Sequence, residues 1–222
     1  MSLAVTATDL TFAYPNGSPL FAGLSLIARQ GSMVCITGPS GAGKSTLLYC
    51  LSGVLPCEGS VELQGRPMPE TPHLRAAMRL ELCGFIFQRG ELLPELTVIE
   101  NVALPLRLAG ASKRSATAEA MHSLSRYKID DCAHRTPDEI SGGQAQRASV
   151  ARALVSRPAI VFADEPTASL DAASRDDVLK ALQTAVDAGT SVVCATHDPV
   201  LMSLADAHFE LTDRSRDEYL AS

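Results

Sequence analysis

The sequence lacks features that would mark several whole classes of protein. No apolar run approaches the ~18 residues that span a membrane, and no charged segment followed by an apolar run opens the chain, so we expect neither a membrane span nor export. Positive charge is in deficit, because 19 Lys and Arg residues against 25 Asp and Glu residues leave a net charge of −6. Binding to nucleic-acid phosphates needs clustered positive charge, so a general nucleic-acid binder is not expected.

Cysteines with metal-binding or redox spacing are also missing. The six cysteines form no C-x-x-C pair and no His/Cys metal pattern. We expect them to be reduced structural thiols of a cytosolic protein. The sequence contains no repeat or low-complexity segment, and 222 residues suffice for one α/β domain with an inserted subdomain.

The most informative segment is GPSGAGKST, residues 38–46, which fits the pattern G-x-x-x-x-G-K-[ST] at every position. An apolar run at 33–36 precedes it and a helix-permissive run follows, which is the strand–loop–helix context of a phosphate-binding loop. Lys44 would reach the β- and γ-phosphates of a nucleotide, and the Ser45 hydroxyl is a ligand for Mg²⁺. The predicted nucleotide-binding residues are Gly38, Pro39, Ser40, Gly41, Ala42, Gly43, Lys44, Ser45 and Thr46.

Apolar patterns along the chain predict an α/β fold. Strands expected near 3–14, 24–28 and 59–63 suggest an antiparallel β layer. Buried strands expected near 33–36, 83–88, 159–164 and 191–196 suggest a P-loop NTPase core, a mainly parallel sheet with flanking helices. We predict a single domain over 1–222, with the core and β layer in about 1–88 and 157–222 and an inserted α-helical subdomain in about 89–156.

A second anion-binding element is expected within the helical insertion. The segment ISGGQ, residues 140–144, places a capping serine, Ser141, and the glycines Gly142 and Gly143 before Gln144 at the start of a helix. One nucleotide needs only one phosphate-binding helix start. The sequence therefore favours a composite site, in which this element of one subunit covers the nucleotide of another; a merely capped helix is the alternative.

Polar side chains follow two of the strands predicted for the core. Asp164 ends the run IVFAD and is the expected Mg²⁺ partner of the phosphate loop, while Glu165 is placed to polarise the attacking water. His197 follows the last predicted strand, at the carboxyl edge where ligands bind in open α/β sheets, and is expected to contact a γ-phosphate. The other histidines have no such placement.

Two further side chains are candidates by position. Gln88 ends the strand expected near 83–88 and is placed to bring its carboxamide near Mg²⁺ and water. Tyr14, on the run-out of the first strand, is placed to stack on an adenine ring, although spacing alone favours ordinary packing.

The ordered set of GPSGAGKST, Gln88, ISGGQ, IVFADE, SLD and the histidine of ATHD resembles the ATP-binding subunit of the ATP-binding cassette family over nearly the whole chain. The segment ISGGQ is a conservative variant of the family's LSGGQ. The resemblance implies a homodimer that holds two ATP molecules with Mg²⁺, in which Tyr14 stacks on adenine, residues 141–144 of the opposite chain form a lid, and Asp171 links the two sites. The implied half-site comprises the catalytic residues Lys44, Gln88, Glu165 and His197 and the metal ligands Ser45, Gln88 and Asp164.

The stretch FIFQRGELLPELTVIENVALPLRLAG, residues 85–110, is similar to the ATPases of an exporter-type group that includes macrolide efflux, lipoprotein release and haem efflux. It implies a cytoplasmic subunit held at the inner face of the cell membrane by integral-membrane permease subunits. The segment EPTASLDA, residues 165–172, is most similar to haem-efflux ATPases, which favours haem or another amphipathic substrate. An amino-acid-type importer is the alternative, because importers share the element LTV-x-ENV. A soluble cassette ATPase acting on nucleic acid or ribosomes is a more distant one.

Apolar residues are unusually dense shortly after Gln88. They are Leu92, Leu93, Pro94, Leu96 and Val98. Two explanations remain open: a small core beneath the helical insertion, or part of a groove for a short permease helix. Because Gln88 is expected to sense Mg²⁺ and γ-phosphate, a partner held directly downstream would move when the site fills.

Overall fold

A five-stranded parallel sheet forms the centre of the computed structural model, which describes residues 2–15, 17–88, 91–168 and 170–211. In spatial order its strands are β6 (Cys83–Ile86), β7 (Ile160–Asp164), β8 (Ser191–Ala195), β3 (Met33–Thr37) and β9 (Ala207–Glu210). Every neighbouring pair runs parallel. All residues of β7 and β8 are buried, as expected for strands covered on both faces. Because the strands are parallel, their carboxyl ends meet at one edge of the sheet.

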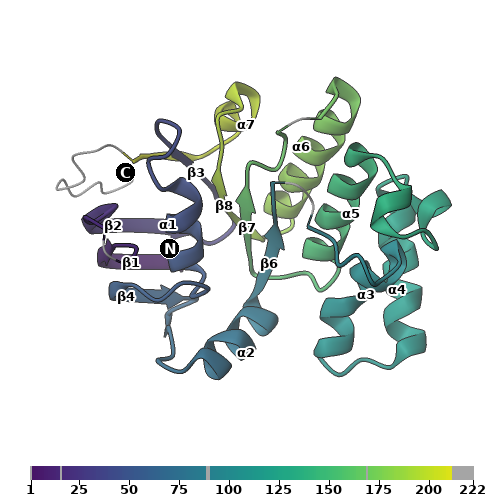
Figure 1. Cartoon of the computed structure of the whole chain (residues 1–222), viewed down its shortest axis with the longest axis horizontal. Helices are drawn as coiled ribbons and strands as arrows, with labels where there is room; N and C mark the ends of the chain where they lie inside the picture. Colours follow the sequence, from purple (N-terminus) through teal and green to yellow (C-terminus); the bar gives the residue numbers. More distant parts are fainter. Residues whose placement is uncertain (1, 16, 89–90, 169, 212–222) are drawn as a thin grey trace.

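A second sheet is antiparallel and contains the N-terminal strands. Its order is β2 (Phe21–Arg29), β1 (Leu3–Phe12), β4 (Glu58–Leu63) and β5 (Arg66–Pro67). Helix α1 (Lys44–Leu51) packs against both sheets, because its buried Leu47 and Leu51 share one apolar cluster with Val5 of β1 and Ile36 of β3 (Figure 1). The two sheets therefore share a core, and the start of α1 is held firmly at its edge.

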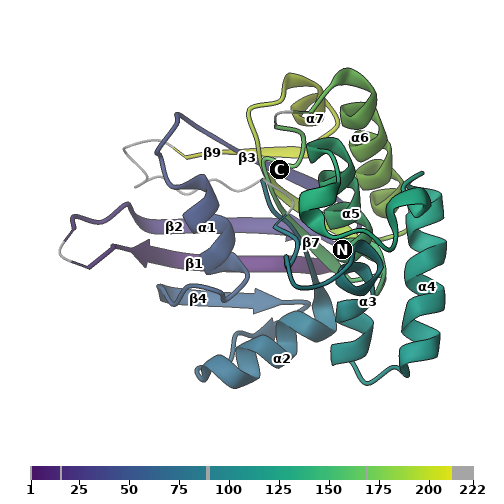
Figure 2. The same cartoon turned by 45° about the vertical axis from the view of Figure 1, so that its right-hand side comes forward.

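Some of the remaining helices pack against the sheets, and others form a separate helical group. Figure 2 shows α3, α4 and α5 standing together beyond the sheets. These helices enclose an apolar cluster of their own, which includes Val98, Leu124 and Ala151. The helices are α2 (Pro72–Leu82), α3 (Val98–Leu108), α4 (Lys113–Arg126), η1 (Asp130–Cys132), η2 (Pro137–Glu139), α5 (Gly142–Leu154), α6 (Ala172–Asp187) and α7 (Pro199–Ser203).

The predicted fold class is confirmed: a mainly parallel sheet with flanking helices carries an antiparallel β layer and a helical subdomain. The domain boundaries near residues 88 and 157 stay a prediction. Strand β6 is shorter than expected and ends at Ile86, so Gln88 lies two residues beyond it. Within the described residues, no helix combines the length and apolarity needed to cross a membrane.

Candidate functional site

The phosphate loop joins β3 to α1 and depends on glycine for its shape. Gly43 precedes α1 with φ 97°, and a Cβ there would lie 2.6 Å from Cδ2 of Leu20. Gly38 has φ 142°, and a Cβ there would lie 2.3 Å from the carbonyl oxygen of Leu211. At Gly38 both the backbone conformation and the nearby backbone carbonyl exclude a side chain. At Gly43 the positive φ favours glycine, and a Cβ would also require the Leu20 side chain to move.

The side chains at the start of α1 point into the loop and toward β7. Lys44 is only 8 % exposed, and its Nζ donates to the carbonyl oxygens of Gly38 and Pro39, each at 3.0 Å. The Ser45 hydroxyl donates to Oδ1 of Asp164 at 2.9 Å. The loop thus places an ammonium group and a hydroxyl–carboxylate pair beside one another.

The Asp164 carboxyl is poorly solvated and is a good partner for a cation. Burial raises its pKa above the ordinary value, and the Ser45 hydroxyl and the Lys44 ammonium only partly oppose that rise. A hydroxyl, a carboxylate and a carboxamide are oxygen ligands of the kind that Mg²⁺ prefers. The three residues predicted to bind Mg²⁺ are Ser45, Asp164 and Gln88, and their donor groups therefore suit this ion.

Glu165 and His197 meet where β7 and β8 end. Asp164 and Ala195 are the last paired residues of these two strands, so the chain segments that follow them lie side by side. The backbone N–H of His197 donates to Oε2 of Glu165 at 3.3 Å, and Nε2 of the ring lies 3.5 Å from Oε1. Glu165 adopts a left-handed backbone, φ 44°, and its N–H donates to the carbonyl of Ala195 at 2.8 Å. This strained conformation aims the carboxylate at the histidine.

Tyr14 and Gln88 are both exposed. The Tyr14 hydroxyl shares a 2.9 Å hydrogen bond with the Thr46 hydroxyl, so the ring lies over the end of the phosphate loop. The 53 % exposure of Tyr14 leaves its ring open to a ligand. Gln88 follows Phe87, whose carbonyl is bound by α5 through Gln146.

Gln146 is a connecting residue that the sequence analysis missed. Its side chain is 2 % exposed, and its Nε2 donates to the carbonyl of Phe87 at 3.1 Å and to that of Pro166 at 3.0 Å. It therefore ties α5 both to the segment of Gln88 and to the segment that follows Glu165. The only feature of the sequence that could have pointed to Gln146 is its position two residues after the ISGGQ segment.

The ISGGQ segment begins α5 as predicted. Ser141 caps the helix, because its hydroxyl accepts from the N–H of Gln144 at 3.2 Å while Oε1 of Gln144 accepts from the Ser141 N–H at 2.9 Å. Among the described residues, no hydrogen bond or ion pair joins residues 141–144 to residues 38–46. Asp171 caps α6, whose first turn packs against Gly143. The neighbouring Ser169 of the SLD segment lies outside the described residues.

An apolar groove of about 260 Å³ opens beside Phe87, but Leu93 does not line it. Its apolar walls include Leu80, Phe85, Phe87, Leu104, Pro105 and Leu108. Leu93 is held instead by the buried Asn101 side chain, whose Oδ1 accepts from the Leu93 N–H at 2.7 Å and whose Nδ2 donates to the Leu93 carbonyl at 3.0 Å. Val98 and Leu92 belong to the helical core cluster instead. A groove is present near the expected place, but the stretch expected to line it does not; its walls come mainly from β6, α2 and α3.

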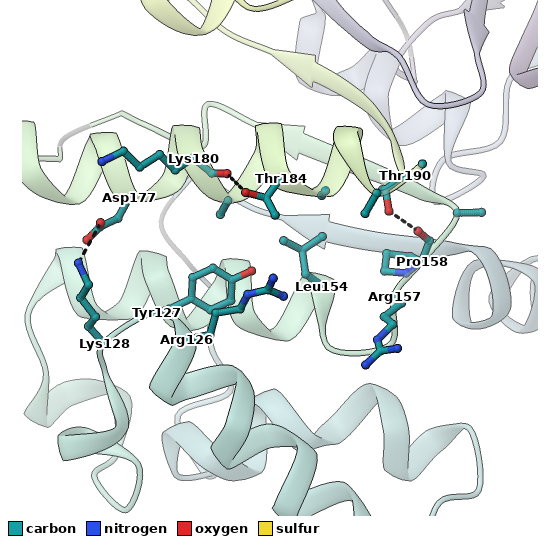
Figure 3. A pocket seen from close by; sticks show the side chains of 15 residues that line it. Arg126, Tyr127, Lys128, Leu154, Arg157, Pro158, Asp177, Lys180, Thr184 and Thr190 are labelled. Atoms are coloured by element: carbon teal, nitrogen blue, oxygen red, sulfur yellow. Dashed lines mark hydrogen bonds and ion pairs between the residues drawn. The ribbon is translucent and has the colours of Figure 1, made fainter.

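A second hollow, of about 840 Å³, is lined by the ends of α4 and α5, by α6 and by the turns before β7 and β8 (Figure 3). Its wall includes Pro158 and Thr190, which precede β7 and β8, so it opens at the amino edge of the sheet rather than at the carboxyl edge. Thr190 donates to the Pro158 carbonyl at 3.0 Å, and Lys128 pairs with Asp177 at 3.8 Å. This hollow has no part in the nucleotide chemistry considered above.

Comparison with known proteins identifies this arrangement. The family model described as ABC transporter matches residues 21–168, two thirds of the chain and most of the region just described. This chain belongs to the ABC transporter family. As an ABC ATPase subunit it binds and hydrolyses ATP to power a permease.

Individual relatives extend the match over almost the full chain. The lipoprotein-releasing system ATP-binding protein LolD of Aquifex aeolicus is 40 % identical over 201 residues, which is 89 % of each chain. The macrolide export ATP-binding/permease protein MacB of Salmonella paratyphi A is 38 % identical over 96 % of this chain, which spans only 34 % of that relative. The dimeric, post-hydrolysis ATP-binding cassette MJ0796 bound to ADP and Pi superposes with a TM-score of 0.88, at 30 % identity and 94 % coverage of both chains.

Proposed function

We propose that this ABC ATPase subunit drives an exporter whose permease transmits force to its cargo, with haem or another amphipathic molecule as substrate. The similarity to a macrolide export protein over 96 % of the chain, together with that to a lipoprotein-releasing ATPase, supports export. The subunit would be held at the inner face of the membrane by its permease.

Purification from native membranes, followed by reconstitution of the copurified permease into liposomes, tests the direction of transport. An exporter moves its cargo away from the side on which ATP and this subunit are added. Accumulation on the ATP side would instead support the amino-acid-type importer, and a subunit that copurifies with ribosomes or DNA and no permease would support the soluble alternative.

Within the site, we assign the phosphate grip to residues 38–46 and the adenine contact to Tyr14. The Lys44 ammonium has three N–H donors, and two of them bond the carbonyls of Gly38 and Pro39, which leaves one for a phosphate oxygen. Mg²⁺, which neutralises phosphate charge when bound, would be held by Ser45, Asp164 and Gln88.

The hydrolytic step is assigned to Glu165 and His197. In-line attack on a γ-phosphate leaves little covalent work for protein groups, so orientation and charge carry the rate. The carboxylate of Glu165 would orient and deprotonate the attacking water. His197, held by the 3.3 Å bond between its N–H and that carboxylate, would contact the γ-phosphate from the neighbouring strand.

We further propose that the site is completed by a second copy of the chain. Residues 141–144 make no hydrogen bond to the phosphate loop of their own subunit within the described residues, and the similar cassette is a dimer. The glycines of this segment start a helix, where backbone N–H groups favour an anion. The lid over each ATP would thus belong to the partner subunit.

A mixing experiment separates assembly across the dimer from assembly within one chain. Ser141→Arg damages the lid, and Lys44→Ala damages the phosphate grip. If the lid acts across the dimer, an equal mixture forms heterodimers with one intact site in about half of the dimers. The mixture then reaches about one quarter of the wild-type rate where the two sites act independently and a smaller rate where they are coupled, in either case above that of each variant alone. A mixture no more active than the separate variants, with heterodimers shown by tag exchange, would refute the composite site.

We propose that the permease binds in the apolar groove beside Phe87. Leu108 at its rim is 64 % exposed, and the groove adjoins the segment that carries Gln88. An exposed apolar groove of this kind suits a short amphipathic helix. Movement of Gln88 on nucleotide binding would then reach the permease directly.

A further inference from the structure

The carboxylate of Asp198 collects hydrogen bonds from three separate segments. Arg175 of α6 donates from Nε to Oδ2 at 2.7 Å and from Nη2 to Oδ1. Thr167, in the loop after Glu165, donates to Oδ2 at 2.8 Å. The Asp198 side chain is only 10 % exposed. Burial acts to raise its pKa, but the bonds from Arg175 and Thr167 lower the pKa below the ordinary value, so the group is held as a carboxylate.

Helix capping accounts for only part of this arrangement. Asp198 caps α7, because its Oδ1 accepts from the N–H groups of Val200 at 2.9 Å and Leu201 at 3.4 Å. The cap uses Oδ1 alone. Oδ2 faces Arg175 and Thr167, which belong to other segments and are not needed by a cap. The second oxygen therefore serves a connection between segments.

That connection reaches the lid segment through the first turn of α6. A Cβ on Gly143 would lie 2.7 Å from Oγ of Ser174 and 3.9 Å from Oδ2 of Asp171. Asp171 in turn accepts from the N–H of Ser174 at 2.8 Å, and its carbonyl accepts from the N–H of Arg175 at 2.9 Å. Gly143 thus rests on the same turn that carries the Arg175 guanidinium.

We propose that Arg175 and Asp198 are positioning residues that couple the two ATP sites of the dimer. The inference rests on the composite site proposed above, in which each chain lends its lid to one ATP and its Glu165 and His197 to the other. A lid drawn onto the partner's ATP displaces the first turn of α6. The rigid two-pronged contact of Arg175 with Asp198 passes that displacement to His197 and to the loop after Glu165.

The test compares Arg175→Gln with a matched control on the same helix. Arg175→Gln should lower kcat about tenfold, which is about 1.4 kcal/mol, with KM for ATP nearly unchanged, because orientation is lost while the phosphate loop is intact. The Hill coefficient for ATP, which two coupled sites raise above 1, should fall to about 1. Gln183→Met removes a polar contact within α6 alone, the 3.0 Å bond from Nε2 to Asp187 Oδ1, and should change neither value.

A second variant separates coupling from folding. Asp198→Asn keeps an oxygen for the α7 cap, and asparagine caps helices as well as aspartate does. It should reproduce the kinetic change of Arg175→Gln, and the double variant should be no worse than either single one, since both break the same link. If Arg175→Gln unfolds, Arg175→Lys, which keeps the charge and loses the two-pronged geometry, takes its place.

Several outcomes would overturn the coupling. They are a wild-type Hill coefficient of 1, an Arg175 variant whose kcat and Hill coefficient match those of Gln183→Met, and strictly additive losses in the double variant. Each leaves the mixing experiment unaffected, so the composite site would still stand. Failure of the mixing experiment would refute the composite site itself.

Discussion

Replacement of Gln146 by methionine tests whether one buried carboxamide holds two functional segments together. Methionine has a similar length and no hydrogen-bond donor. The change removes both bonds from Nε2, at 3.1 Å to the Phe87 carbonyl and at 3.0 Å to the Pro166 carbonyl. Pro166 is buried, so water cannot readily replace the lost donor there, whereas the half-buried Phe87 segment is more accessible.

The expected loss follows from those two carbonyls. Leaving a buried acceptor without its donor costs about 1–3 kcal/mol, and a partly solvated one costs less. We therefore expect the free energy of unfolding to fall by about 2–3 kcal/mol. For a chain of this length each kcal/mol lowers Tm by about 2–4 °C, which predicts a fall of roughly 5–10 °C.

Thermal unfolding followed by circular dichroism measures the change, and ATPase assays below Tm measure its effect on function. Because the carboxamide ties the segment of Gln88 to that of Glu165, kcat should fall even where the variant is folded. Gln183→Met is the control: its Nε2 bonds only Asp187 on the helix surface, at 3.0 Å, and its stability should stay within about 0.5 kcal/mol of wild type. A Gln146→Met variant that matches this control would refute the reasoning.

Three further predictions concern the site and the groove. Glu165→Gln should keep ATP binding, lose at least about a hundredfold in hydrolysis and accumulate an ATP-bound dimer on gel filtration; wild-type turnover would contradict its role. Leu108→Asp should weaken copurification with the permease, whereas Leu93→Asp, outside the groove, should not; the reverse result would move the docking site. Gly143→Ala places a Cβ 2.7 Å from Oγ of Ser174, so the hydroxyl must rotate away from Asp171. Because alanine also favours the helix by up to about 1 kcal/mol, we expect a net loss of only about 1 kcal/mol by urea unfolding, which Ser174→Ala should reverse; no rescue would show that the contact is not the cause.

The chemistry of the site was largely predictable because its motifs are local in the sequence. A phosphate loop needs glycines and a lysine within one turn, and buried strands leave runs such as IVFAD. These signals placed Lys44, Asp164 and His197 at strand or helix ends, and parallel strands must bring such ends to one edge. The helix at 72–82 was not predicted, and Met78 is its only buried residue.

Tertiary structure alone decided which distant side chains meet. Gln146 binds residues 59 and 20 positions away, and Asp198 binds Arg175 across 23 positions, contacts that no helical or strand periodicity encodes. The same holds for the groove, where Asn101 binds the backbone of Leu93 and the walls include Leu80, Phe87 and Leu108. Local sequence specifies which groups are available and on which element they lie. Their connection depends on the packing of elements against one another, which only the folded chain brings about.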